Sequence, residues 1–269
     1  HDPFAAACGG VMGEQSKIQW TDTTWNPVTG FTHVSEGCRN CYAERIVPRQ
    51  GHAFKDVTLH PDRLDWPLKW RKPRRIFVNS LSDMFHEDVP NHFILDIWNI
   101  MNRCPQHTFQ ILTKRHERMR SFLGKGFMGL GTPNSYLPSP NVWLGVSIES
   151  REHMNRADVL RQTPAAVRFL SLEPLLEDLG KIDLSGIDWV IIGGESGPKA
   201  RPCDFSWIQS IRDQCQMSGV ACFIKQLGAK PTGTGKPWCD QHGFEDRKGG
   251  NPAEWPENFR VREYPSMDR

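Results

Sequence analysis

The chain has 269 residues, of which 38% are hydrophobic, and a mean hydropathy of -0.53. These values are typical of a soluble protein with enough apolar side chains for a full core, in one large domain or two small ones. The net charge of +2 permits a nucleic-acid partner without indicating one, because a strong phosphate binder usually has a clear basic excess. No apolar run reaches the roughly 18 residues of a membrane-spanning helix, so we expect none.

The start of the chain and its cysteines indicate where the protein works. Residues 1–11 lack the basic start and apolar run of a signal peptide, and we interpret them as a cloning remnant before a natural start at Met12. Cys8 lies in this remnant. The other cysteines are Cys38, Cys41, Cys104, Cys203, Cys215, Cys222 and Cys239. Their odd number and their scatter favour reduced thiols and a cytoplasmic protein.

The first part of the chain is irregular. Residues 20–37 are rich in turn-forming residues, although Phe31–Ser35 could form a short first strand. A helix is expected to begin near Tyr42 and to end by Arg49. Residues 52–73 are expected to form a covering loop.

From residue 75 onward, short apolar runs alternate with segments of helical periodicity. The apolar runs predict strands at 75–79, 108–112, 141–146, 167–170, 189–192 and 220–224. The helical segments are 91–102, 115–123, 151–161 and 206–217, with a further short helix after Pro174. Such alternation predicts an α/β fold with a parallel sheet and right-handed crossovers.

A partial or closed parallel β/α barrel of the TIM type is favoured over a doubly wound open sheet. We predict a single barrel domain over residues 12–269, with a Gly- and Pro-rich insertion at 124–140. A C-terminal tail is expected to wrap the body from about residue 230.

Polar residues follow every predicted strand. In a parallel barrel the carboxyl ends of the strands meet at one mouth, where active sites lie. The candidate site residues at these ends are Asp83, Lys114, Ser147, Glu149, Glu173, Gly193, Gly194, Glu195 and Lys225. Three of the strands are followed within a few positions by a glutamate. The alternative is that any strand reaching solvent ends in polar residues, and that Glu173 before Pro174 simply begins a helix.

A Cys-x-x-Cys pair, Cys38 and Cys41, can present two thiolates to one metal ion or to an iron–sulfur cluster. A complete zinc site needs further ligands, and His33 is near in sequence, whereas Cys203 or Cys239 would come from afar. Two unliganded thiols in a turn remain the alternative. Cys104, Cys215 and Cys222 are expected to be small core residues.

Several motifs resemble one family. The run from Trp20 through Thr-Trp-Asn-Pro-Val-Thr-Gly30 to Gly37-Cys-Arg-Asn-Cys-Tyr42 resembles a phage-associated family of uncharacterised proteins defined by a three-cysteine motif. The match continues through 111–115, 142–146, 169–176, 189–198 and 223–228. This family is similar to radical S-adenosylmethionine (SAM) enzymes, with spore photoproduct lyase as a relative. The resemblance implies a partial β/α barrel, a [4Fe–4S] cluster on three cysteines, and SAM bound to the open iron.

Within the radical-SAM-like hypothesis, we assign roles to the candidate residues from the order of the strands and, for His33, from its nearness to the cysteines in sequence. The metal ligands would be Cys38, Cys41 and His33. The cofactor-binding residues would be Tyr42, Asp83, Ser147, Gly193, Gly194 and Glu195, and the catalytic residues would be Lys114, Glu149, Glu173 and Lys225. One position departs from the family pattern, because Phe31 stands where the first cysteine is expected.

Two hypotheses follow. The first is a radical-SAM-like enzyme with an electron donor, acting on a nucleotide or nucleic-acid-related substrate. The second is a non-radical barrel that binds zinc or another divalent ion, and that serves as a hydrolase using the strand-end glutamates or as a nucleic-acid-binding module. Trp25, Tyr42, Lys114 and Arg115 could then stack on and hold a nucleotide or single strand, or they could equally form a packed rim.

Overall fold

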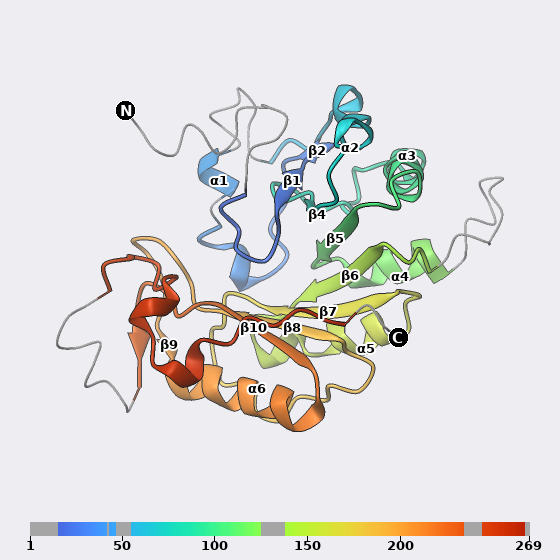
Figure 1. Cartoon of the computed structure of the whole chain (residues 1–269). Coiled ribbons are helices and arrows are strands. Elements are labelled where there is room, and N and C mark those ends of the chain that lie inside the picture. The colour runs from blue at the N-terminus through green and yellow to red at the C-terminus, as the bar shows by residue number, and fades with distance from the viewer. Residues whose placement is uncertain (1–15, 42, 47–54, 125–137, 234–243, 267–269) are drawn as a thin grey trace. The chain divides into compact units, whose positions relative to one another are not determined.

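The computed structural model describes residues 16–266 except 42, 47–54, 125–137 and 234–243 (Figure 1). The strands are β1 (Thr23–Trp25), β2 (Val28–Thr29), β3 (Thr58–Leu59), β4 (Arg75–Val78), β5 (Thr108–Thr113), β6 (Val142–Ser147), β7 (Val167–Leu172), β8 (Trp189–Gly193), β9 (Cys203–Asp204), β10 (Ala221–Gln226) and β11 (Pro231–Thr232). The helices are α1 (Ala43–Ile46), α2 (Trp66–Lys69), α3 (Asn91–Asn102), α4 (His116–Gly124), α5 (Asn155–Arg161) and α6 (Phe205–Ser218).

The chain divides into two compact units. The N-terminal unit comprises 1–34, 41–145 and 162–166, and the C-terminal unit comprises 35–40, 146–161 and 167–269.

The main sheet has seven strands in the order β1-β4-β5-β6-β7-β8-β10. In the N-terminal unit β4 pairs in parallel with β1 and with β5, and in the C-terminal unit β8 pairs in parallel with β7 and with β10. β1 and β10 are the two ends of this order in the described chain, so the sheet is the open, partial form of the predicted β/α barrel. The prediction of an α/β fold with a parallel barrel-type sheet is therefore confirmed.

The predicted apolar runs form the strands because they can be buried on both faces. All five residues of β8 are buried, and β6 is buried along its whole length. In the C-terminal unit α6 lies along β8 and β10 (Figure 1) and buries Phe205, Ile208, Ile211 and Cys215. The side chain of Asp204 accepts a hydrogen bond from Ser206 N at the start of this helix.

Three local predictions are wrong. The described part of residues 52–73 is not an irregular loop, because it contains β3 and α2. Phe31–Ser35 is not a strand, and the seventh strand of the sheet is instead β1, whose Thr23–Trp25 pairs with β4. Trp25 becomes fully buried there. No helix follows Pro174, because the Leu175 and Leu176 amides donate to the carbonyls of Gly193 and Glu149 rather than along their own segment.

The prediction of one domain with an insertion and a tail stays a prediction. Residues 1–15, most of the 124–140 insertion, and 234–243 of the tail lie outside the described residues. In the described part of the tail, Val261 O accepts from Ile224 N, and Glu263 N donates to Cys222 O. None of the described helices is both long enough and apolar enough to cross a bilayer.

Gly194 offers a test of how tightly the end of β8 packs. A Cβ on Gly194 would lie 2.5 Å from Leu227 O and 2.8 Å from Gly228 Cα, both backbone atoms. We expect Gly194→Ala to lower the free energy of unfolding by about 1–3 kcal/mol, because overpacking against backbone cannot relax by a rotamer change. Urea unfolding followed by tryptophan fluorescence measures the loss.

Gly124→Ala is the matched control. No heavy atom lies within 4 Å of its added Cβ, and Gly124 is helical, so this variant should be as stable as the parent or more stable. Equal losses in the two variants would contradict the packing described at Gly194.

Candidate functional site

In the C-terminal unit, a buried glutamate at the end of β6 holds the loop that carries Cys38. Glu149 is fully buried. Its Oε1 accepts from Ser35 Oγ at 2.9 Å, and its Oε2 accepts from Arg156 Nη1 at 3.0 Å. A buried carboxylate needs such partners, because burying an unpaired ion in a protein costs several kcal/mol even after the surroundings relax.

The loop passes so close to Glu149 that only glycine fits at one position. A Cβ on Gly37 would lie 2.4 Å from Glu149 Cγ. Because Arg156 and Ser35 already fix the carboxylate, this side chain cannot move aside easily. Gly37 in the Cys-x-x-Cys run is thus explained by its approach to Glu149.

A second glutamate, at the end of β8, holds the other end of the same loop. Glu195 Oε2 accepts from Asn40 Nδ2 at 3.1 Å and from the Arg201 backbone N at 2.7 Å. The Arg201 guanidinium binds both carboxylate oxygens and also donates to Glu36 O at 3.1 Å. Burial raises the pKa of Glu195, but the hydrogen bonds from Arg201 and Asn40 outweigh it and leave the pKa below its ordinary value. Glu195 is therefore a charged group at neutral pH.

Cys38 is positioned by this loop. Its backbone N donates to Ser35 O at 3.0 Å, and its Sγ lies 3.8 Å from Ser35 Oγ. The side chain is buried, with 2% of its surface exposed. The loop thus presents one thiol on a backbone that two strand-end carboxylates hold in place.

Glu173, the third strand-end glutamate, forms an ion pair with Lys225, which was also predicted to be catalytic. Lys225 Nζ lies 3.0 Å from Glu173 Oε1, and Ser171 Oγ donates to Glu173 Oε2 at 3.3 Å. A Cβ on Gly193 would lie 2.4 Å from Glu173 Oε1. The structure thus brings Glu173, Lys225 and Gly193 together.

Backbone groups of two predicted cofactor-binding residues are bound within the protein. Gly194 N donates to Gln226 O at 3.1 Å, and Gln226 Nε2 donates to Gly194 O at 2.7 Å. Ser147 O accepts from Arg156 Nη1 at 2.6 Å. The proposed cofactor roles of Gly193, Gly194, Glu195 and Ser147 stay predictions, next to these structural roles.

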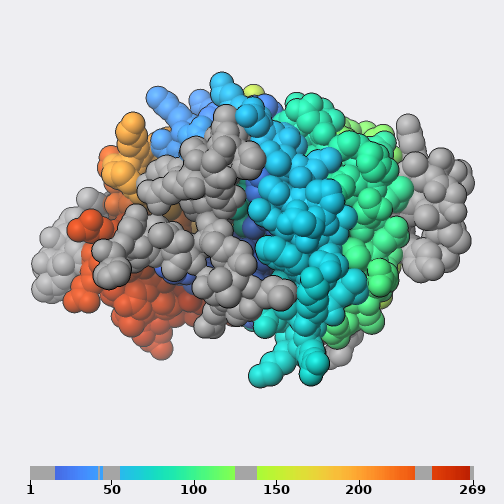
Figure 2. All heavy atoms as spheres, turned by 90° about the horizontal axis from the view of Figure 1, so that it is seen from above, coloured from blue at the N-terminus to red at the C-terminus, as the bar shows by residue number. Residues whose placement is uncertain are grey.

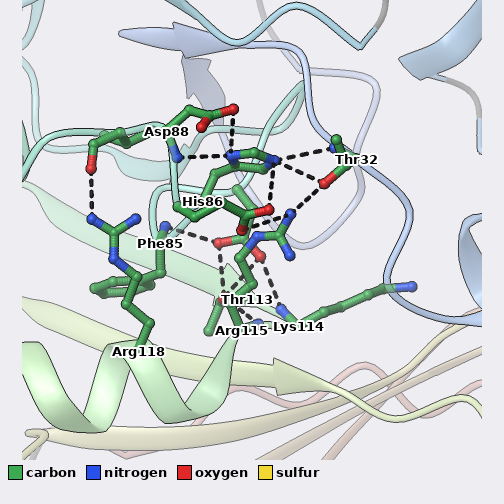
Figure 3. Close-up of polar contacts among 11 residues, drawn as sticks. Thr32, Phe85, His86, Asp88, Thr113, Lys114, Arg115 and Arg118 are labelled. Atoms are coloured by element: carbon green, nitrogen blue, oxygen red, sulfur yellow. Dashed lines mark hydrogen bonds and ion pairs between the residues drawn. The ribbon is translucent and has the colours of Figure 1, made fainter.

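In the N-terminal unit, Thr32 is held by a buried histidine and an arginine (Figure 3). The Asp88 N–H donates to His86 Nδ1 at 3.1 Å, and His86 Nε2 lies 2.9 Å from Thr32 Oγ1 and accepts from the Thr32 N–H at 3.4 Å. Arg115 Nη2 donates to the same hydroxyl at 2.8 Å. Burial and the Arg115 charge lower the pKa of His86 against the opposing effect of the neighbouring carboxylates. His86 is thus neutral at physiological pH.

Asp83 closes the turn after β5 and joins the same network through Thr113, whose Oγ1 accepts from Arg115 N. It accepts from Thr113 Oγ1 at 2.8 Å, from Lys114 N at 3.1 Å and from Phe85 N at 2.9 Å. The structure therefore places Asp83 against the backbone of Lys114, at the start of α4.

The remaining predicted metal ligands lie near position 31. His33 Nε2 forms an ion pair with Glu44 Oε1 at 2.7 Å. Cys41 and Phe31 both pack against the apolar cluster of Ala43 and Leu81. The side chain at position 31 and the Cys41 thiol therefore contact the same small cluster. Tyr42 lies outside the described residues.

The described residues do not provide a complete set of metal ligands. No group of three or more His, Cys, Asp or Glu side chains in that part of the chain is arranged to hold a metal ion. Burial raises the pKa of the Cys203 thiol to about 12, which disfavours the thiolate that a metal requires. Cys239 lies outside the described residues.

Several residues of this arrangement were missed by sequence reasoning. They are Ser35, Asn40, Arg156, Arg201, Thr32 and His86. The only signal for Ser35 and Asn40 was their position beside the cysteines. Arg156 and Arg201 follow their glutamates by several residues within a helix or a loop, where a cation usually lies in solvent.

Comparison with known proteins gives one family and a distant structural likeness. The family described as "Protein of unknown function (DUF5131)" matches residues 15–250. No curated protein matches the chain. One similar solved structure is spore photoproduct lyase complexed with dinucleoside spore photoproduct, at 13% identity and a TM-score of 0.42, over 75% of this chain and 62% of that one.

A second similar structure is a mutant of spore photoproduct lyase with bound AdoMet and dinucleoside spore photoproduct. The identity is 13% and the TM-score 0.41, over 71% of this chain and 60% of that one. The chain thus spans less than two thirds of the length of these solved structures.

The buried His86 predicts a dependence of stability on pH. Its pKa is lowered in the folded protein, so below about pH 6.5 the unfolded chain binds a proton that the folded chain does not. Stability should therefore fall as the pH drops below that value. His86→Gln should cost about 1–3 kcal/mol through lost hydrogen bonds and should flatten this dependence. Urea unfolding at about pH 7.5 and about pH 5.5 measures both effects.

Thr32→Val is the control. It removes the hydroxyl that the ring contacts but keeps the titrating group, so stability should fall while the pH dependence remains. A His86→Gln variant with the full pH dependence of the parent would contradict the assignment.

Proposed function

Since this chain belongs to the DUF5131 family, we propose that it is a radical-SAM-like iron–sulfur protein acting on a nucleotide or nucleic-acid substrate. The observation that carries the proposal is the fixed loop Ser35–Asn40. Glu149 and Glu195 hold this loop through Ser35 and Asn40, so that Cys38 is positioned before any metal binds. Such pre-organisation is what a metal-binding loop requires.

The residues present do not fit a cluster held by three thiolates. Cys38 and Cys41 supply two, and Phe31 cannot ligate iron. We propose instead that it binds an iron–sulfur cluster weakly, and that position 31 decides how much cluster it retains.

The substrate class is proposed from the cations at the strand ends. Lys114 and Arg115 follow β5 in the N-terminal unit, and Lys225 lies within β10 in the C-terminal unit; each of these side chains could oppose the charge of a phosphate. Reduction of a cluster would also require a one-electron donor. SAM remains the proposed partner of the cluster, with Gly193, Gly194 and Glu195 as its candidate contacts.

A second candidate function is a non-radical zinc protein. The observation that favours it is the His33–Glu44 pair, because a metal-bound imidazole commonly has a carboxylate on its other nitrogen. Cys38, Cys41 and His33 would then be the ligands, with a water in the fourth position.

Anaerobic reconstitution with iron and sulfide tests the proposal. We expect Phe31→Cys to hold about four iron ions per chain and to show the visible charge-transfer band of an iron–sulfur cluster. The reason is that this variant adds a third thiolate at a position that contacts Ala43 and Leu81, as Cys41 also does. The parent chain should hold less iron and lose it on gel filtration.

Phe31→Ser is the matched control, because it removes the phenyl ring without adding a thiol. If Phe31→Cys retains no more iron than Phe31→Ser, the cluster proposal is wrong. If the parent chain instead retains about one zinc per chain in metal analysis, and Cys38→Ser abolishes it, the second candidate is correct.

A further inference from the structure

A basic segment lies in the N-terminal unit, away from the predicted strand ends. Residues 60–75, which we call the basic face, include α2 and the first residue of β4. They carry six Lys or Arg residues and two Asp residues, a net charge of +4, whereas the whole chain has +2. The rest of the chain is therefore net negative. The cyan segment that contains α2 lies at the surface in Figure 2.

Only part of this charge is compensated by neighbouring carboxylates. Lys69 pairs with Asp65 at 2.7 Å, and Arg75 pairs with Asp22 at 2.9 Å. Arg71 and Lys72 are exposed, and neither forms an ion pair with any residue that the structure describes. The basic face thus presents uncompensated cations to solvent.

The cations are displayed on a well-ordered backbone. Arg74 lies over the ring of Trp70, with its guanidinium carbon 5.4 Å from the ring centroid. Trp70 is buried, and Arg74 O accepts from Thr108 N at 2.9 Å. Pro67 O lies 3.2 Å from His107 Nε2. Binding an anion here would leave this backbone in place, so the entropic cost would come mainly from ordering side chains such as Arg71 and Lys72.

The composition of the face distinguishes between anionic partners. Four of the six cations are arginines, whose planar fork matches phosphate oxygens. A membrane surface would require an amphipathic helix with exposed apolar residues. Instead, α2 has only four residues, Trp70 and Pro67 are buried, and Leu68 is the one large apolar side chain of this described segment that is exposed. Trp66, which is half-buried beneath Arg63, leaves an aromatic edge next to the cations.

We propose that the basic face binds the sugar-phosphate backbone of a nucleic acid. Arg71, Lys72 and Arg74 would contact successive phosphates, and affinity would come from charge without sequence preference. The choice of a nucleic acid as the partner of the basic face rests on the proposed function, whereas the location of the binding surface does not. It involves none of the strand-end residues, so the iron content of the reconstituted protein neither supports nor weakens it.

The test uses the full chain and a fluorescein-labelled DNA duplex of about 20 base pairs, with anisotropy titrations between about 50 and 200 mM salt. The test variant carries Arg71→Gln, Lys72→Gln and Arg74→Gln. The control variant carries Lys181→Gln, Arg247→Gln and Lys248→Gln, three exposed cations of the C-terminal unit with the same total charge change. Circular dichroism and thermal unfolding check that both variants are folded.

The expected result is that the test variant binds roughly tenfold or more weakly at low salt. Its slope of log affinity against log salt should fall by about 2 to 3, since each lost phosphate contact removes about 0.9. The control variant should bind as the parent does. The proposal is overturned if the parent does not bind the duplex, if both variants lose affinity equally, or if anionic phospholipid vesicles bind the parent in place of DNA.

Discussion

A buried carboxylate that must be paired organises the cysteine loop. Glu149 has no access to solvent, so its charge depends on Arg156 and on the hydroxyl of Ser35. This requirement fixes the backbone around Ser35, and the close approach of Gly37 follows from it. Glu195 applies the same constraint at Asn40 and, through Arg201, at Glu36. The position of Cys38 is therefore a consequence of two strand-end charges.

In both units, hydrogen bonds with buried or half-buried polar side chains hold part of the segment that runs from Thr32 to Asn40. In the N-terminal unit, Thr32 is bound by the neutral His86 and by Arg115. Polar groups that follow the strands thus serve first to position a loop, and only then as candidates for chemistry. Lys225 and Glu173 differ, because their ion pair contacts no residue of the cysteine loop among the described contacts. They remain the better candidates for contact with a substrate.

The sheet could be predicted from the sequence, whereas the partners of the strand-end groups could not. Short apolar runs such as Trp189–Ile192 are stable only where both faces are buried, as in the interior of a parallel sheet. All six predicted runs form strands. The error at Phe31–Ser35 arose because a short turn-rich segment carries no comparable signal, and Trp25 supplied the buried strand instead. The Glu149–Arg156 and Glu195–Arg201 pairs depend on tertiary position. Sequence reasoning therefore found the glutamates but missed what they bind.

Hydrogen exchange in the metal-free protein tests the central claim, that the loop is positioned before metal binds. The Cys38 and Arg39 amides donate to Ser35 O and Glu36 O, so the account predicts exchange roughly a hundredfold or more slower than in an unstructured peptide. Glu149→Gln should remove much of this protection, because it weakens the contact with Arg156 that holds the loop's carboxylate partner. Exchange of these amides at the unstructured rate in the parent protein would contradict the account.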